Sequence, residues 1–204
     1  MKPRIPWQAK VVSKVLLSRV PFAYSLWRKI GLFKHGDMVR PEYAYKVFTT
    51  HFNRVDFLNK NDKYTALELG PGDSVLSAIL AKIFGASKCY LVDSGRYAKD
   101  DLSLGKHLLD YLKTKGHRVS FDLEKHNSLN DLIVSLDCSY MTNGLNSLRL
   151  IPTGTVDFIW SQAVLEHVKK SKFLETMREL RRIIAPHGVC SHEIDFKDHL
   201  GGAL

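Results

Sequence analysis

The chain has 204 residues, of which 45% are hydrophobic and 25% charged, so its composition excludes a wholly disordered protein. This length allows one domain with a buried core but excludes two large domains. The net charge of +9 is unevenly placed: residues 1–40 carry nine Lys or Arg and one acid, whereas the other 164 residues carry 21 basic and 20 acidic side chains. The basic N-terminus therefore predicts a local anionic partner.

The apolar segments are too short and too often interrupted for a membrane span or a cleaved secretion signal. The longest candidate, residues 11–26, falls short of the roughly 20 apolar residues that a spanning helix needs, and Pro21 and two charges interrupt it. Three cysteines lack a C-x-x-C spacing: Cys89, Cys138 and Cys190. We therefore expect a cytoplasmic protein with small, buried cysteines and no metal site.

Residues 1–60 are basic and aromatic, and their apolar side chains recur near helical spacing. The pattern predicts one or two short amphipathic helices broken at Pro21, followed by a helix over residues 41–58 that begins with a proline. A polar break covers residues 59–63. We therefore divide the chain into an N-terminal helical extension or cap, residues 1–60, and a core domain, residues 61–204.

Strands and helices alternate through the core domain. Short apolar runs bounded by glycine or polar residues predict strands, and apolar side chains at steps of three or four predict helices. The predicted strands cover residues 64–69, 88–93, 138–142, 156–161 and 189–196. The first three predicted helices cover residues 74–84, 102–115 and 129–136.

The last helix of the core is long and precedes the final strand. Ser171 is predicted as its N-cap, and a proline and a glycine end it. Four of its apolar side chains are expected to face the sheet: Phe173, Met177, Leu180 and Ile184.

This alternation predicts parallel strands joined by right-handed crossovers, hence a doubly wound, mostly parallel α/β sheet. Ligands of such sheets bind beyond the carboxyl ends of the strands, where the strand order reverses. We therefore expect the turns that follow Leu69, Val92 and Trp160 to lie on one rim and to form the binding site.

The sequence ALELGPGDS, which contains the first predicted turn, is the most informative motif. Gly70 and Gly72 permit a sharp turn and a close approach of a ligand to the main chain, and the next helix directs free N–H groups to the same point. Glu68 can receive a cationic amine, and Asp93, after the next strand, can accept hydrogen bonds from two ribose hydroxyls. A dinucleotide fits less well, because Val75 replaces the third glycine of G-x-G-x-x-G.

With these motifs the chain resembles the class I S-adenosylmethionine-dependent methyltransferases, in particular the type-11-like group. Residues 68–72 resemble the E/D-x-G-x-G signature, and Asp93 matches the acid after the second strand. Residues 156–168 resemble the fourth-strand motif, and residues 179–188 resemble the helix and turn before the fifth strand. The resemblance covers residues 64–196 and implies a Rossmann-like methyltransferase fold with S-adenosyl-L-methionine as cofactor.

The resemblance also implies which residues hold each part of the cofactor. For the methionine part they are Glu68, Gly70, Pro71, Gly72 and Asp73. For the ribose and adenine they are Asp93, Ser94, Gly95, Asn143, Gly144 and Leu145, although the family's usual acid is absent from the last three. Ser161 and Gln162 are expected to flank the reactive methyl group.

The family's sheet normally ends in an antiparallel hairpin after the fifth strand. Only residues 197–204 follow the last predicted strand, too few for that hairpin. The resemblance therefore predicts either a chain truncated at the C-terminus or an N-terminal segment that covers the open sheet edge.

A methyl group on a sulfonium is already activated, so alignment of the acceptor and exclusion of water are expected to provide most of the catalysis. A hydroxyl or protonated amine acceptor would also need a general base. His167, about one helical turn past Ser161 and Gln162, is the predicted base, and a structural hydrogen-bonding role is its alternative.

The acceptor itself is not identified by any motif, and a small molecule, a glycan or a lipid-linked substrate are all compatible with the sequence. For residues 1–40 three interpretations remain open: a solvated cap, a peripheral contact with an anionic membrane surface, or nucleic-acid binding. A non-catalytic adenosylmethionine-fold module and an RNA-directed methyltransferase are the alternative functions.

Overall fold

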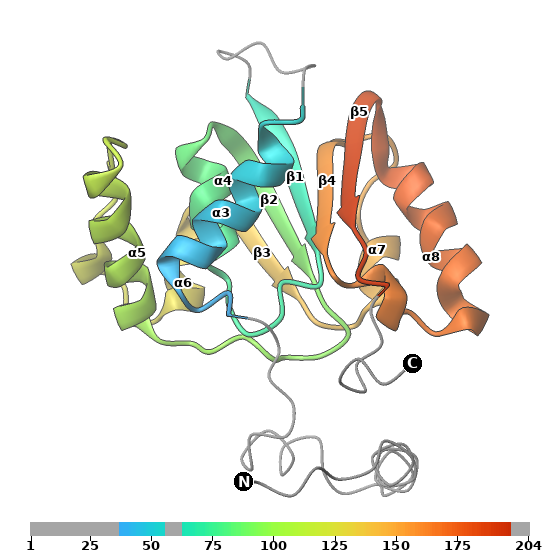
Figure 1. The fold of residues 1–204 in the computed structure, drawn as a ribbon, viewed down its shortest axis with the longest axis horizontal. Coiled ribbons are helices and arrows are strands. Elements are labelled where there is room, and N and C mark those ends of the chain that lie inside the picture. Colours follow the sequence, from blue (N-terminus) through green and yellow to red (C-terminus); the bar gives the residue numbers. More distant parts are fainter. Residues whose placement is uncertain (1–36, 56–62, 197–204) are drawn as a thin grey trace, which may run out of the picture. The chain divides into compact units, whose positions relative to one another are not determined.

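The computed structural model describes residues 37–55 and 63–196 (Figure 1). The predicted helices before residue 37 lie outside the described residues. In chain order the elements are α3 (Pro41–Phe52), β1 (Tyr64–Leu69), α4 (Leu76–Ile83), β2 (Ala86–Val92), α5 (Leu102–Thr114), η1 (Leu123–Lys125), α6 (Leu129–Ser135), β3 (Cys138–Met141), α7 (Leu145–Arg149), β4 (Val156–Gln162), η2 (Leu165–His167), α8 (Lys170–Ile183) and β5 (Ile184–Glu193).

The described strands form one sheet in the order β3-β2-β1-β4-β5, with every neighbouring pair parallel. The strand order reverses at β1, because the chain moves outward to β2 and β3 before it returns to β4. Glu68 of β1 pairs with Leu91 of β2 and with Trp160 of β4, so the carboxyl ends of the three central strands are level. The predicted doubly wound fold and its common rim are therefore confirmed.

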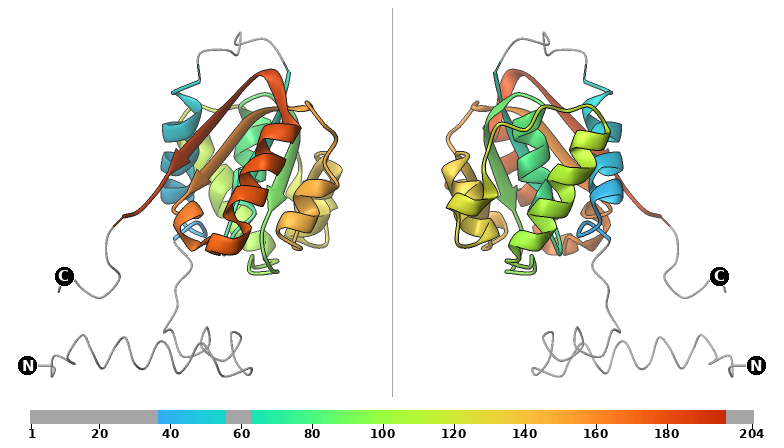
Figure 2. Two further views of the ribbon diagram at one scale, coloured as in Figure 1. Left: turned by 90° about the vertical axis from the view of Figure 1, so that its right-hand side faces the viewer. Right: turned by 90° about the vertical axis from the view of Figure 1, so that its left-hand side faces the viewer.

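Helices cover both faces of the sheet, as the edge-on views of Figure 2 show. On one face α3, α4, α5 and α6 bury their apolar side chains against β1, β2 and β4. On the other face α7 and α8 pack over the same strands with a smaller core. Neighbouring residues of β1 face opposite cores, which is why Ala66 and Leu67 belong to different clusters.

Helix α3 precedes the sheet in sequence but is packed onto it. Phe48 is fully buried, with its ring centroid 5.4 Å from that of Trp160 and 6.5 Å from that of Phe158. The helix ends at Phe52 rather than at the predicted residue 58, and residues 53–54 form a turn. Whether residues 1–60 act as a separate extension stays a prediction, because most of them lie outside the described residues.

The helix that precedes the last strand departs from its prediction. Ser171 is not the N-cap of α8, because the helix begins one residue earlier, at Lys170. Phe173 does not face the sheet and is 40% exposed, whereas Thr176, Leu180 and Ile183 form the buried stripe. The reason is that α8 begins at the rim, so its first turn extends past the ends of the strands (Figure 1).

Strand β5 begins at Ile184, five residues before the prediction, and ends at Glu193. Val156 of β4 pairs with Ile184 of β5, and Phe158 pairs with Val189, so an advance of two residues along β4 matches an advance of five along β5. This irregularity accommodates Pro186, which cannot donate a ladder hydrogen bond. Cys190 on this strand is exposed, contrary to the prediction, whereas Cys89 and Cys138 are buried.

Two further observations concern the part of the chain that the structure describes. No helix there is long and apolar enough to cross a membrane. No group of three or more histidine, cysteine or acidic side chains is arranged there to hold a metal ion.

Candidate functional site

The first candidate residues lie in the turn that follows β1. Gly70 and Gly72 both adopt positive φ angles, +72° and +71°, which L side chains rarely adopt. The amide of Gly70 donates to the carbonyl of Val92, 2.8 Å away, so the turn is tied to the end of β2. A Cβ at Gly70 would lie 2.5 Å from a methyl group of Val164, and only glycine fits there.

Asp93 follows β2 and is 8% exposed. One of its carboxylate oxygens accepts the amide of Gly72 at 3.0 Å, and the other accepts the amide of Ser94 at 2.7 Å. Asp93 thereby links the turn after β1 to the turn after β2. A carboxylate has about four lone-pair sites, so an acid of this kind can accept several hydrogen bonds at once.

Glu68, the acid of the predicted signature, is 1% exposed and points from β1 towards α4. Its carboxyl group accepts a hydrogen bond from the hydroxyl of Ser77. Burial raises the pKa of Glu68 to about 7, an effect that Ser77 and Trp160 reduce and the nearby charge of Asp93 increases. The two acids predicted to hold the cofactor are therefore close enough to interact, and Glu68 is the more enclosed of the two.

Asp73 lies beside the same turn, after the buried Pro71. Burial raises the pKa of Asp73 to about 6, while Lys99 acts against that rise and Asp37 adds to it. One carboxylate oxygen of Asp73, Oδ1, is buried and has no hydrogen-bond partner among the residues that the structure describes. A buried anionic oxygen without a donor is costly, so this position suits a ligand that carries N–H groups.

The turn after β3 lies directly beside Asp93. The amide of Gly144 donates to the carbonyl of Asp93 at 2.7 Å, and the amide of Asn143 donates to the hydroxyl of Ser147 at 2.9 Å. Asn143, Gly144 and the first residue of α7, Leu145, are thereby brought to Asp93 and Ser94, as the resemblance implies.

Residues 94–98 are held by a side chain that the sequence analysis did not identify. The hydroxyl of Tyr140 accepts the amides of Tyr97 and Ala98 at 3.0 and 3.2 Å and lies 3.2 Å from the carbonyl of Gly95, to which it donates. Nothing in the motif pattern marks a tyrosine on β3 for this role, because the contact spans more than 40 residues of sequence.

The end of β4 carries a dense set of polar contacts. Ser161 is fully buried, and its hydroxyl lies 2.7 Å from Nδ1 of His192 on β5. The side-chain amide of Gln162 contacts His51 of α3 at 3.2 Å and Glu193 of β5 at 2.7 Å. His51 was not predicted as a site residue, although it is the group that links α3 to this end of the site.

His167 lies on the exposed surface of η2, and its amide donates to the carbonyl of Val164 at 2.9 Å. It is separated by a turn from the buried Ser161. Its role as a general base stays a prediction.

Ala163, directly after β4, has a φ of +52° and so adopts the left-handed conformation without being glycine. Such a conformation costs an alanine roughly 1–2 kcal/mol. Ala163→Gly removes this cost, but glycine has more conformational freedom in the unfolded chain, which offsets part of the gain. We therefore expect Ala163→Gly to raise the free energy of unfolding by about 0.5–1 kcal/mol. Urea denaturation tests this, and Ala98→Gly, at a residue without positive φ, is expected to lower stability instead. Equal losses in both variants would refute the strain at Ala163.

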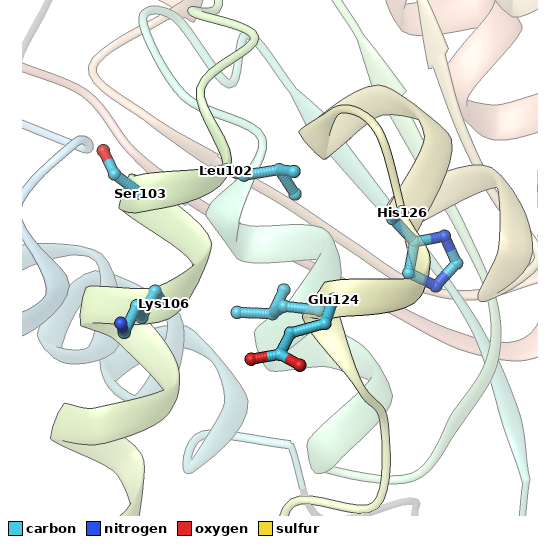
Figure 3. A pocket seen from close by; sticks show the side chains of 6 residues that line it. Leu102, Ser103, Lys106, Glu124 and His126 are labelled. Atoms are coloured by element: carbon cyan, nitrogen blue, oxygen red, sulfur yellow. The ribbon is translucent and has the colours of Figure 1, made fainter.

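A shallow groove of about 230 Å³ lies between the start of α5 and η1 (Figure 3). Its lining consists of Leu102, Ser103, Lys106, Leu123, Glu124 and His126. None of the site residues predicted from the sequence lines this groove, so it is a separate feature from the rim.

A parallel sheet of this order, with a glycine turn after its first strand and an acid after its second, matches the first five strands of the class I, Rossmann-like methyltransferase fold. A family model described as "Methyltransferase domain" matches residues 67–191, and the chain belongs to that family. No curated protein matches the sequence.

Several solved structures are similar at low sequence identity. The PH0226 protein from Pyrococcus horikoshii is 15% identical, with a TM-score of 0.48, and the match covers 84% of this chain and 66% of that one. A DhpI complex with SAM and HEP is 16% identical, with a TM-score of 0.41 over 95% of this chain and 64% of that one. A chain of the "Complex between the Haloferax volcanii Trm112 methyltransferase activator and the putative methyltransferase" is 15% identical, with a TM-score of 0.44 over 76% of this chain and 56% of that one. The chain thus spans between about half and two thirds of the length of these proteins.

Proposed function

We propose that this chain binds S-adenosyl-L-methionine at the rim formed by the turns after β1, β2, β3 and β4 and transfers its methyl group to an acceptor nucleophile. The observation that supports the proposal most is the pair of acids beside the glycine turn. Asp93 lies against Gly72, and Asp73 presents a buried carboxylate oxygen that receives no hydrogen bond from residues 37–55 or 63–196. A nucleoside that carries an amino acid offers hydroxyls for the first acid and an ammonium group for the second.

In this proposal each turn holds one part of the cofactor. Gly70, Pro71, Gly72 and Asp73 hold the methionine part, and Glu68 lies behind them at the end of β1. Asp93 accepts the ribose hydroxyls, while Ser94, Gly95, Asn143, Gly144 and Leu145 enclose the adenine.

S-adenosylmethionine, when bound, supplies a methyl group activated by a positive sulfur. The protein's residues then need to orient the acceptor and exclude water, because positioning accounts for most of such a reaction. Ser161 and Gln162 flank the methyl position, and His167 accepts the proton of the acceptor where the acceptor carries one. The acceptor is proposed to be a small molecule, a glycan or a lipid-linked compound.

Calorimetric titration with S-adenosylmethionine and S-adenosylhomocysteine tests the proposal. We expect Asp93→Ala to bind both about 10–100-fold more weakly, because hydrogen bonds to a charged acceptor contribute about 1.5–3 kcal/mol. Asp157→Ala is the matched control, since Asp157 also accepts a backbone amide, that of Thr65 at 2.8 Å, but lies away from the rim. Its affinity should equal that of the wild type. Equal affinities in wild type and Asp93→Ala, or no binding by either, would refute the proposal.

A further inference from the structure

A chain of four polar side chains joins α3 to the ends of β4 and β5. His51 is fully buried, with Nδ1 2.8 Å from the hydroxyl of Ser191 and Nε2 3.2 Å from the side-chain oxygen of Gln162. The amide nitrogen of Gln162 in turn lies 2.7 Å from a carboxylate oxygen of Glu193. His51 lies outside residues 67–191, the segment that matches the methyltransferase family.

Only one arrangement of hydrogens fits this chain when the ring is neutral. The carboxylate of Glu193 can only accept, so the nitrogen of the Gln162 amide must face it and the oxygen must face His51. Nε2 of His51 therefore carries the hydrogen, and Nδ1 accepts the hydroxyl of Ser191. Burial lowers the pKa of His51, which favours the neutral ring.

Gln162 lies where β4 meets the glycine turn. It directly precedes Ala163, whose amide donates to the carbonyl of Glu193 at 2.9 Å and whose φ is +52°. Val164, two residues after Gln162, packs directly against the α-carbon of Gly70. The backbone around Gln162 is thus fixed on both sides, and the orientation of its side chain depends on His51 and Glu193.

Packing alone does not account for a histidine at this position. Phe48 and Phe52 of α3 already pack edge-on against Trp160 and Phe158 of β4. A buried polar ring adds a desolvation cost unless every polar atom finds a partner. Both ring nitrogens of His51 have such partners. The histidine therefore adds directional contacts rather than apolar burial.

We propose that His51 is a positioning residue that fixes the side-chain amide of Gln162 at the end of the site where the methyl group and its acceptor meet. This inference rests on the proposed function. The amide, held by His51 and Glu193, retains one N–H and one lone pair with which to contact cofactor or acceptor. Helix α3, although N-terminal to the family-matched segment, thereby becomes part of the site.

The test compares the affinities of S-adenosylmethionine and S-adenosylhomocysteine, which differ only in the methyl group and its charge. We expect His51→Phe, which keeps an aromatic ring but loses both nitrogens, to change the ratio of the two dissociation constants by about 3–10-fold. Gln162→Ala should change this ratio in the same direction. The double variant should change the ratio no more than Gln162→Ala does, because both substitutions remove the same interaction. His51→Gln, which restores a donor towards Gln162, should recover most of the wild-type ratio.

His117→Phe is the matched control, since the Nε2 of His117 also contacts α3, at the hydroxyl of Tyr45, 3.0 Å away, but on the opposite side from β4. The ratio of the two dissociation constants in His117→Phe should equal that of the wild type. Nitrogen NMR of the wild type tests the tautomer of the His51 ring without any variant. The spectrum should show the hydrogen on Nε2 of His51 at neutral pH.

An unchanged ratio in His51→Phe, or a hydrogen on Nδ1, would overturn the inference while the proposed function stands. Failure of the wild type to bind either compound would instead overturn the proposed function and remove the basis of this inference. If His51→Phe does not fold, the Gln162→Ala ratio and the NMR spectrum of the wild type decide.

Discussion

Replacing Gly70 with alanine is expected to lower the free energy of unfolding by about 2–5 kcal/mol. The φ of +72° costs an L side chain roughly 1–2 kcal/mol. The new Cβ would also lie 2.5, 2.8 and 3.2 Å from three carbons of Val164, a stiff β-branched side chain, and overpacking of this kind costs about 1–3 kcal/mol. Thermal or urea unfolding measures the loss, which also displaces the turn at the proposed cofactor site.

Two variants separate the causes. Gly116 has a φ of +81° and no atom within 4 Å of an added Cβ, so Gly116→Ala should show the backbone cost alone. Adding Val164→Ala to Gly70→Ala should relieve the steric part without relieving the backbone part. If Gly70→Ala is no worse than Gly116→Ala, the close contact between the glycine turn and Val164 is refuted.

Glu68→Gln is expected to stabilise the protein at alkaline pH, relative to its effect at acid pH, by about 3–4 kcal/mol. Burial raises the pKa of Glu68 from 4.5 to about 7, so the folded protein keeps this proton over a range where the unfolded chain has lost it. Each unit of difference corresponds to about 1.4 kcal/mol. Wild-type stability from this group is thus present below pH 4.5 and lost as pH rises towards 7. Glutamine does not ionise, so the Glu68→Gln variant does not lose this stability as pH rises.

Urea denaturation at pH 5 and pH 8.5 measures the difference between wild type and Glu68→Gln. Taking that difference cancels the contributions of other titrating groups to the pH dependence of stability. Asp73 also lowers stability as pH rises, but at lower pH, whereas His51 raises stability as pH rises. Ser77→Ala should extend the loss to higher pH, because the Ser77 hydroxyl lowers the pKa of Glu68. Parallel pH profiles for wild type and Glu68→Gln would contradict the account.

The core strands and the rim could be predicted because their signals are local. Tyr64–Leu69 is a short apolar run before a glycine turn, and its predicted bounds agree with β1. Asp93, Gly144 and Gly72 meet at the rim because parallel strands in this order bring their carboxyl ends together. The predictions for Gly72 and Asp93 needed only periodicity, turn residues and the rule for the strand order, whereas the one for Gly144 came from the resemblance to the methyltransferase family.

The polar contacts at the end of β4 could not be predicted in this way. His51 and Gln162 are 111 residues apart, and no spacing rule connects a helix before the sheet to the fourth strand. Helix α7 has five residues, fewer than periodicity can reveal. The early start of β5 depends on an irregular pairing with β4 that absorbs Pro186.

Soaking S-adenosylhomocysteine into crystals of the protein tests the central claim most directly. The account predicts that the ribose hydroxyls lie on the Asp93 carboxylate and that the amino-acid end lies against residues 70–73, close to the unpartnered oxygen of Asp73. The compound bound in the groove between α5 and η1, or bound with Asp93 turned away from it, would contradict the account.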